Sequence, residues 1–225
     1  MSSRDTVLAS IRRSLGVSGT EAPRRQAVDD RIAGHPAGVI PARGQLPPAE
    51  RLALFKSMVL AAAATLDHLP STEAVPGAIA DYLRARNLPP TILRGADARL
   101  AALPWENAPA LDVWIGPSDG RQLAGLSHAF AGVAESGTVV MLSGPDNPST
   151  VNLLPDHHLV VVQAEDVAGD YEAVWSRLRA KFGAGIMPRT VNWITGPSRS
   201  ADIEQTLLLG AHGPRSLHIL LVGEG

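Results

Sequence analysis

The sequence predicts an α/β fold in which a mainly parallel sheet is covered by helices. Three observations support this fold class: short apolar runs recur from residue 91 onward, helical segments lie between several of them, and the runs are almost wholly apolar. Such strands are typical of a parallel sheet that is buried on both faces. The expected strands are 91–93, 113–115, 138–142, 159–163, 191–194 and 217–222.

The first element expected along the chain is a short amphipathic helix. Its apolar face collects Val7, Leu8, Ile11 and Leu15. Gly16 would end the helix. Residues 17–48 are rich in proline, glycine and arginine without sustained periodicity, which predicts an extended arm or a partly mobile linker. The helix could pack on its own domain or, on so long a tether, dock onto a partner. We therefore expect a helix and arm over 1–38 and one α/β domain over 39–225.

Helical periodicity marks three segments of the α/β domain. Apolar side chains recur at helical spacing over 52–69, which predicts an amphipathic helix. A second helix is expected over 72–87, with Pro76 in its first turn, where the missing N–H is harmless. The third has its apolar stripe between Tyr171 and Phe182.

The composition excludes several classes of function. A net charge of −2 gives no strong field for nucleic acid or an anionic membrane, and 45% hydrophobic residues fit an ordinary soluble protein. No cysteine is present, so a cysteine-ligated cofactor must belong to another protein. The charged N-terminus and the lack of an apolar run of about 20 residues predict a cytoplasmic protein without a membrane span. P-loop and dinucleotide signatures are missing, and the sequence indicates no particular cofactor.

Residues 134–138 form the first candidate site, directly before an expected strand. Gly137 would allow a tight turn, while Ser136 and Thr138 supply two hydroxyls. Glu135 could act as a general base or accept a hydrogen bond from a ligand. A covalent role for Glu135 is conceivable, because carboxylates in some acyl transfers become transient anhydrides. The alternative is a hydrogen-bonded turn that opens the strand, and the residue types alone favour this alternative.

His158 is a second candidate because it precedes an apolar strand. Ligands of parallel sheets bind in a crevice beyond the carboxyl ends of the strands, and the imidazole could lie at its mouth. A surface histidine at the start of a strand is an equal alternative. The seven histidines form neither H-x-x-x-H nor H-E-x-x-H, so we expect no metal site.

Residues 195–204 are the most informative segment of the sequence. They follow the expected strand 191–194, so the turn would stand at a carboxyl end of the predicted sheet. They then lead into leucines whose spacing suits a helix. Gly196, Pro197 and Ser198 would therefore form the turn at a helix N-terminus. Unpaired backbone N–H groups at such a turn make a ready anion site.

Charged side chains around this turn supply the candidate chemistry. Arg199 offers a planar fork for a carboxylate or a phosphate. Asp202 and Glu204 would complement the helix dipole, or favour a ligand hydroxyl or a cation. A second tight turn follows, with a glycine on each side of an imidazole that is a candidate acid or base: Gly210, His212 and Gly213.

Taken together, four motifs resemble the LUD domain family and, within it, the lactate utilization proteins of type C. They occupy residues 134–138, 153–158, 196–204 and 210–214. The resemblance implies a fold like that of the sugar-phosphate isomerases and CoA transferases. It also implies a non-redox subunit that helps two iron–sulfur partner proteins oxidise L-lactate to pyruvate. The absence of cysteine fits that division of labour.

Three hypotheses follow for the site, which we expect the separate motifs to form together. In the first, Arg199 pairs with the carboxylate of lactate or pyruvate, and His212 or Glu135 handles the hydroxyl proton. In the second, the protein is a stand-alone enzyme acting on a sugar phosphate, a CoA ester or a folate. The third is a ligand-binding regulatory module. The sequence does not decide whether this chain is itself catalytic.

Overall fold

The structure is a computed structural model that describes residues 2–183, 185–203 and 206–224. The chain divides into two compact units, Met1–Val39 and Ile40–Gly225, and each is described by itself. In the part of the chain that is described, no helix has the length and hydropathy that crossing a membrane requires.

The first unit consists of the helices α1 (Ser3–Leu15) and α2 (Ala22–Gly34), and neither contains a buried residue. The predicted helix that ends at Gly16 is confirmed. Gly16 adopts a left-handed conformation with φ 64°, which suits glycine at a helix end. The expectation of an extended arm over 17–48 is wrong where α2 forms. Alanine, arginine and glutamine have high helix propensity and favour a helix there. The sequence analysis missed it because this segment lacks the apolar periodicity on which the prediction relied.

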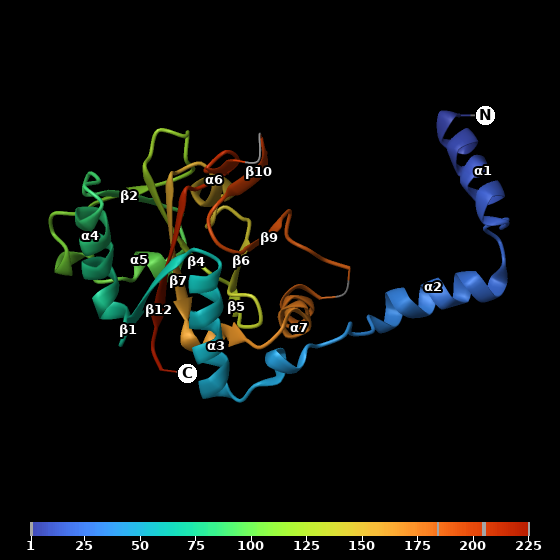
Figure 1. The fold of residues 1–225 in the computed structure, drawn as a ribbon, viewed down its shortest axis with the longest axis horizontal. Coiled ribbons are helices and arrows are strands. Elements are labelled where there is room, and N and C mark those ends of the chain that lie inside the picture. Colours follow the sequence, from blue (N-terminus) through green and yellow to red (C-terminus); the bar gives the residue numbers. More distant parts are fainter. Residues whose placement is uncertain (1, 184, 204–205, 225) are drawn as a thin grey trace. The chain divides into compact units, whose positions relative to one another are not determined.

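A six-stranded sheet in which every described pair is parallel forms the centre of the second unit (Figure 1). In spatial order its strands are β1 (Thr65–Leu69), β12 (Ser216–Val222), β7 (His157–Gln163), β4 (Ala124–His128), β2 (Thr91–Arg94) and β3 (Asp112–Ile115). The α/β fold class with a mainly parallel sheet is therefore confirmed. The strands expected at 91–93, 113–115, 159–163 and 217–222 all lie in this sheet.

Helices cover both faces of the parallel sheet. Alternate residues of a strand point to opposite sides, so each face has its own core cluster. In β7, Val160 packs in the same core cluster as α3 (Pro48–Ala61), whereas its neighbour Leu159 packs in the cluster of α4 (Val75–Ala85). The remaining helices are α5 (Ala98–Ala101), α6 (Ser149–Leu153) and α7 (Tyr171–Phe182), with 3-10 turns at Ala42–Gln45, Thr72–Ala74, Trp105–Asn107 and Ala164–Asp166.

A second sheet has the order β8-β5-β6-β9. Its strands are β5 (Ala131–Val133), β6 (Thr138–Leu142), β8 (Val167–Ala168) and β9 (Val191–Ile194). β6 pairs antiparallel with both β5 and β9. The strands expected at 138–142 and 191–194 therefore exist but lie outside the parallel sheet. β6 lies in this sheet because the short turn between β5 and β6 can join only antiparallel strands. β9 lies there because it pairs with β6.

Two helix predictions are confirmed and one is right only in part. The helix expected over 72–87 is a 3-10 turn followed by α4, with Pro76 in the first turn of α4, and the stripe from Tyr171 to Phe182 is α7. The helix expected over 52–69 ends at Ala61. After it Ala63 takes φ 63°, and the chain turns into β1, whose leucines happen to continue the helical spacing.

The helix expected after the Gly-Pro-Ser turn is wrong. The chain forms a hairpin there, in which β10 (Arg199–Ile203) pairs antiparallel with β11 (Thr206–Leu209). A short apolar run cannot be assigned to helix or strand by its periodicity alone, and here the two segments satisfy each other's backbone groups. The predicted anion site at a helix N-terminus is therefore absent from this turn. Glu204 and the side chain of Asp202 lie outside the described residues.

Candidate functional site

Ser198 joins the two glycine-bearing turns that the sequence singles out. Its backbone N–H donates to the carbonyl oxygen of Pro214 at 2.8 Å, and its own carbonyl oxygen accepts from the N–H of Gly210 at 2.9 Å. Its hydroxyl oxygen also accepts from the backbone N–H of His212 at 3.3 Å. The turn after β9 and the turn before β12 are thus fixed against each other.

A pocket of about 250 Å³ lies between these turns and the starts of β7 and β12. We call it the amino-edge pocket, because it borders the amino ends of parallel strands. Its wall includes five of the predicted ligand-binding residues and the predicted catalytic His212; the five are His158, Gly196, Pro197, Ser198 and Gly213. The other lining residues are Asn152, Leu153, Trp193, Ile194, Thr195, Pro214 and Leu217.

The sequence placed this crevice at the wrong edge of the parallel sheet. The rule that ligands bind beyond the carboxyl ends applies to strands of the parallel sheet. The Gly-Pro-Ser turn instead follows β9, which belongs to the antiparallel part of the second sheet. His158 is the second residue of β7, and Leu217 the second of β12, so the pocket lies where these strands begin.

A buried polar group forms one wall of the amino-edge pocket. Asn152 and His158 both line the pocket and are fully buried, and each is hydrogen-bonded to Ser127, which is 1% exposed. Burial lowers the pKa of His158 to about 3, so its imidazole is neutral at pH 7. The sequence identified His158 but neither Ser127 nor Asn152, because no local pattern marks a polar side chain that tertiary contacts will bury.

Glu135 caps a helix. Its carboxylate oxygen Oε1 accepts from the backbone N–H of Tyr171, the first residue of α7, at 3.1 Å, and the residue is only 6% exposed. A carboxylate at a helix N-terminus satisfies an otherwise unpaired N–H and complements the helix dipole. Gly137 has φ 67°, and a Cβ there would collide with the backbone of α3 at Met58 and Val59. The 134–138 turn therefore has the structural role that its residue types favoured.

Four hydroxyl groups form a continuous cluster beside this turn. Ser136, Thr138 and Tyr171 contact one another at 2.7 to 2.9 Å, and the hydroxyl oxygen of Thr138 lies 2.6 Å from that of Thr195. Thr195 also lines the amino-edge pocket. The cluster thus connects the Glu135 turn to the pocket through hydrogen-bonded hydroxyls.

The three residues expected to do the chemistry are attached to different elements. Arg199 donates from Nη2 to the carbonyl oxygen of Ala62 at the end of α3, at 2.8 Å. His212 is exposed on the pocket wall, whereas Glu135 is buried against α7. Within the described residues no hydrogen bond or ion pair joins the side chains of Glu135, Arg199 and His212 directly. The pocket contains His212, and Arg199 reaches its border at Gly196, since Nη2 would lie 3.2 Å from a Cβ at that glycine.

Comparison with known proteins identifies the family. Residues 53–222 match the family model of the LUD domain. The chain belongs to the LUD domain family. The match covers the whole parallel sheet and both turns of the amino-edge pocket.

Several curated proteins are similar to this LUD domain. A lactate utilization protein C from Geobacillus thermodenitrificans is 32% identical over 173 residues, which cover 69% of this chain and 72% of that protein. A lactate utilization protein C from Halalkalibacterium halodurans is 38% identical over 99 residues, 43% of each chain. An uncharacterized protein from Neisseria meningitidis serogroup B is 34% identical and covers 56% of this chain and 53% of that protein. The alignments thus span only about half the length of the first of these relatives.

One solved structure resembles this LUD domain. It is the crystal structure of a DUF162 family protein from Deinococcus radiodurans, with a TM-score of 0.54 and 27% sequence identity, and the match covers 79% of this chain and 99% of that one. The likeness to sugar-phosphate isomerases and CoA transferases stays a prediction.

A second pocket, of about 520 Å³, lies where the carboxyl-end rule expects one. This carboxyl-edge pocket is lined by the end of β4 at His128, by Asp97 and Arg99 after β2, and by Asp146 and Lys181. Arg99 donates to both carboxylate oxygens of Asp97, and burial lowers the pKa of His128. The sequence analysis missed these residues. A signal was present for Asp97, which lies three residues after β2, a strand that the sequence predicted. His128 ends β4, a strand that the sequence analysis did not predict.

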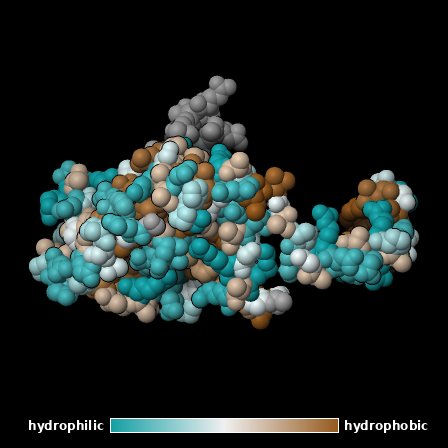
Figure 2. Space-filling model, turned by 90° about the horizontal axis from the view of Figure 1, so that it is seen from below, coloured by the Kyte–Doolittle hydropathy of each residue, from teal (hydrophilic) through white to brown (hydrophobic). Residues whose placement is uncertain are grey.

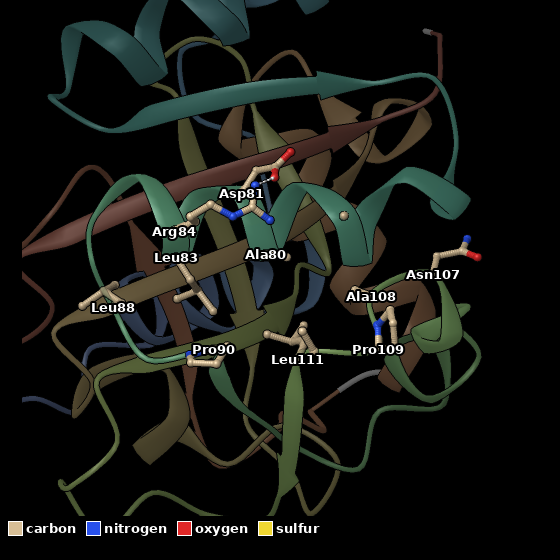
Figure 3. Close-up of a pocket in the computed structure, with 12 residues that line it drawn as sticks. Ala80, Asp81, Leu83, Arg84, Leu88, Pro90, Asn107, Ala108, Pro109 and Leu111 are labelled. Atoms are coloured by element: carbon tan, nitrogen blue, oxygen red, sulfur yellow. Dashed lines mark hydrogen bonds and ion pairs between the residues drawn. The ribbon is translucent and has the colours of Figure 1, made fainter.

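A third pocket, of about 510 Å³, runs along α4 and faces the segment 107–111 (Figure 3). Its charged side chains, Asp81 and Arg84, pair with each other at 2.7 Å and are both exposed. The rest of the wall is mostly apolar. Both charged side chains are exposed to solvent and paired with each other, so neither is set up as a catalytic acid, base or nucleophile. This pocket is therefore a poor candidate for an active site.

Proposed function

We propose that this LUD-domain protein acts in lactate utilization, as a non-redox subunit that binds a small hydroxy or oxo carboxylate in the amino-edge pocket. The observation that carries the proposal is the pocket itself, in which two turns resembling those of the family and a buried histidine enclose about 250 Å³. Pockets for drug-sized ligands start at roughly 300 Å³, so this volume suits a smaller molecule. Relatives named lactate utilization protein C point to the same class of ligand.

The pocket offers donors for a carboxylate. Within the described residues, the backbone N–H groups of Gly196 and Gly213 make no hydrogen bond, and both residues line the pocket. The imidazole of His212 is exposed at the same wall. Arg199 adds a positive charge at the border, beside Gly196. Backbone N–H groups together with a cation are the usual partners of a small anion.

Oxidation of the ligand requires other proteins in this proposal. Converting a 2-hydroxy acid to a 2-oxo acid releases two electrons and two protons, and a chain without cysteine cannot hold an iron–sulfur cluster on thiolates. Two iron–sulfur proteins would accept the electrons. This chain would bind and orient the acid, while His212 or Glu135 would handle a proton.

Three measurements test the proposal. A deletion strain should lose growth on L-lactate and regain it with the wild-type gene, and tagged protein should co-purify with iron–sulfur proteins. Isothermal titration should show binding of L-lactate or pyruvate that weakens at least about tenfold in His212→Ala or Arg199→Ala, a loss of about 1.4 kcal/mol. Arg189→Ala, at another exposed arginine, serves as the control. Normal growth on lactate without the gene would contradict the proposal.

The carboxyl-edge pocket favours a second candidate function. Its volume of about 520 Å³ and its cationic groups Arg99 and Lys181 suit a larger anionic molecule such as a sugar phosphate, a CoA ester or a folate derivative. A thermal-shift screen separates the two functions, because a ligand that binds only the folded state raises its stability. A shift with phosphorylated compounds and none with lactate would favour a stand-alone enzyme. Normal function of both Glu135→Gln and His212→Ala would instead favour a regulatory module.

A further inference from the structure

We propose that Asn152 and His158 recognise the hydroxyl group of the ligand, so that the amino-edge pocket selects a 2-hydroxy acid over the matching 2-oxo acid. This inference rests on the proposed function, because it concerns the ligand of the same pocket. It adds Asn152 as a binding residue and Ser127 as a positioning residue.

Ser127 holds both side chains in place. Its hydroxyl oxygen lies 2.5 Å from Oδ1 of Asn152 and 3.1 Å from Nε2 of His158. All three residues are at most 1% exposed. Helix α6 carries Asn152 and lies directly on β4, which carries Ser127: a Cβ at Gly125 would stand 2.5 Å from the carbonyl oxygen of Val151. The arrangement is thus fixed by backbone packing as well as by hydrogen bonds.

The direction of each hydrogen bond follows from the chemistry of the groups. An amide oxygen can only accept, so the hydroxyl of Ser127 donates its single proton to Oδ1 of Asn152. The contact with His158 must then run the other way, and Nε2–H donates to the oxygen of Ser127. A neutral imidazole carries one proton, which leaves Nδ1 of His158 as an acceptor.

Two polar atoms of this group remain without a protein partner. Among the described residues, Nδ2 of Asn152 and Nδ1 of His158 are buried and make no hydrogen bond. The first is a donor and the second an acceptor, and both residues line the amino-edge pocket. Buried polar groups are nearly always paired, so an unpaired donor and acceptor in one pocket wall indicate a ligand that supplies the complement.

A hydroxyl group supplies that complement. Its oxygen accepts from Nδ2 of Asn152 while its O–H donates to Nδ1 of His158. An oxo group can only accept, so it leaves His158 unpaired, and a methylene group pairs with neither atom. Sites built to hydrogen-bond a hydroxyl discriminate strongly against analogues that lack it. We expect L-lactate to bind at least about tenfold more tightly than pyruvate, and propionate to bind most weakly.

Titration of the full-length protein with L-lactate, pyruvate and propionate tests the inference. His158→Phe removes the Nδ1 acceptor, which a hydroxyl can use and an oxo group cannot, so it should lower the preference for lactate over pyruvate to about twofold or less. Ser127→Ala should weaken that preference too. Nitrogen NMR gives a readout apart from binding: the wild type should show His158 protonated at Nε2, and Ser127→Ala should change this tautomer. Thermal unfolding checks that both variants fold.

The outcomes separate this inference from the proposed function. Equal binding of lactate and pyruvate by the wild type, or an unchanged preference in His158→Phe, would overturn the hydroxyl recognition and leave the carboxylate site standing. Binding of none of the three acids would overturn both. A crystal structure with lactate should place its hydroxyl within hydrogen-bond distance of both atoms. A water bridging Asn152 and His158 beneath bound lactate would also overturn the inference.

Discussion

At Gly137 the absence of a side chain decides how closely the β5–β6 turn approaches helix α3. The residue has φ 67°, and a Cβ would meet the backbone of Val59 and, at 2.5 Å, that of Met58. Backbone cannot move aside as a flexible side chain can. We expect Gly137→Ala to lower the free energy of unfolding by at least about 2 kcal/mol in urea titrations. Gly144→Ala is the control, since a Cβ there meets nothing within 4 Å, and equal losses would contradict this account.

Burial of His158 makes stability depend on pH. Its pKa falls from 6.5 to about 3 in the folded protein, so between these values the unfolded chain binds a proton that the folded chain does not. Stability therefore rises with pH in this window and falls on acidification, by up to about 1.4 kcal/mol per pH unit for one histidine. His218, whose pKa burial lowers to about 4, adds to the loss.

Urea unfolding between pH 4.5 and 7 measures this dependence. His158→Gln should make the pH profile less steep, because glutamine does not titrate, while the contribution of His218 remains. His35→Gln removes an exposed histidine of the first unit and should leave the profile steep. An equally steep profile in His158→Gln would show that other groups cause the acid sensitivity.

Single residues differ in how far the sequence reveals them. Gly137 and the Gly196 turn could be identified because a glycine in a tight turn is recognisable from the residues next to it in the sequence. Asn152 could not, since its role depends on Ser127, which lies 25 residues away in the chain, and on burial of both. Polar groups buried by long-range contacts leave no mark on local sequence patterns.

At the scale of elements, Glu135 joins the β5–β6 turn to the first residue of α7. Glu135→Ala leaves the N–H of Tyr171 without an acceptor, so we expect a loss of about 1 kcal/mol in unfolding free energy. Glu135→Gln keeps an acceptor oxygen and should lose less than about half of that. Thermal and urea unfolding of both variants measure the difference. Equal losses in the two variants would mean that the carboxylate charge, and not the hydrogen bond, supports the helix.

The elements that the sequence predicted poorly are strands whose structure depends on pairing with another strand. The leucines of β11 suit a helix by spacing, but β10 supplies a strand to pair with them. β1 continues the apolar periodicity of α3, yet it becomes a strand because β12 pairs with it along its whole length. By contrast, α4 and α7 have their own apolar stripes and start signals, and were predicted correctly.

For the whole molecule, the two edges of the parallel sheet have different pockets. The sequence indicated the sheet, because apolar strands alternate with helices, but it assigned the Gly-Pro-Ser turn to the carboxyl edge. The true edge follows from the second sheet, which takes β6 and β9 out of the parallel sheet. Which sheet a strand joins is a long-range property, so local sequence could mark the two glycine-bearing turns but could not show which edge of the parallel sheet they border.

The division into two units predicts that residues 1–39 are dispensable for the fold of the rest. Neither α1 nor α2 contains a buried residue, and the buried apolar cores are built from Leu52 onward. Deleting 1–39 should change the Tm by less than about 2 °C, equivalent to under 1 kcal/mol for a domain of this size, and leave carboxylate binding intact. Differential scanning calorimetry and titration measure both. A Tm lower by about 5 °C or more would show that the first unit stabilises the second.

The same deletion tests whether α1 contacts partners. Its exposed apolar face (Figure 2) includes Val7, Ile11 and Leu15. If this face docks onto the proposed iron–sulfur proteins, the deletion and Ile11→Glu should both abolish their co-purification, because a buried unpaired charge is costly in an interface. Ser10→Glu, at an exposed polar position of α1, is the control with the same change in charge. Co-purification that survives both the deletion and Ile11→Glu would place the contact on the second unit.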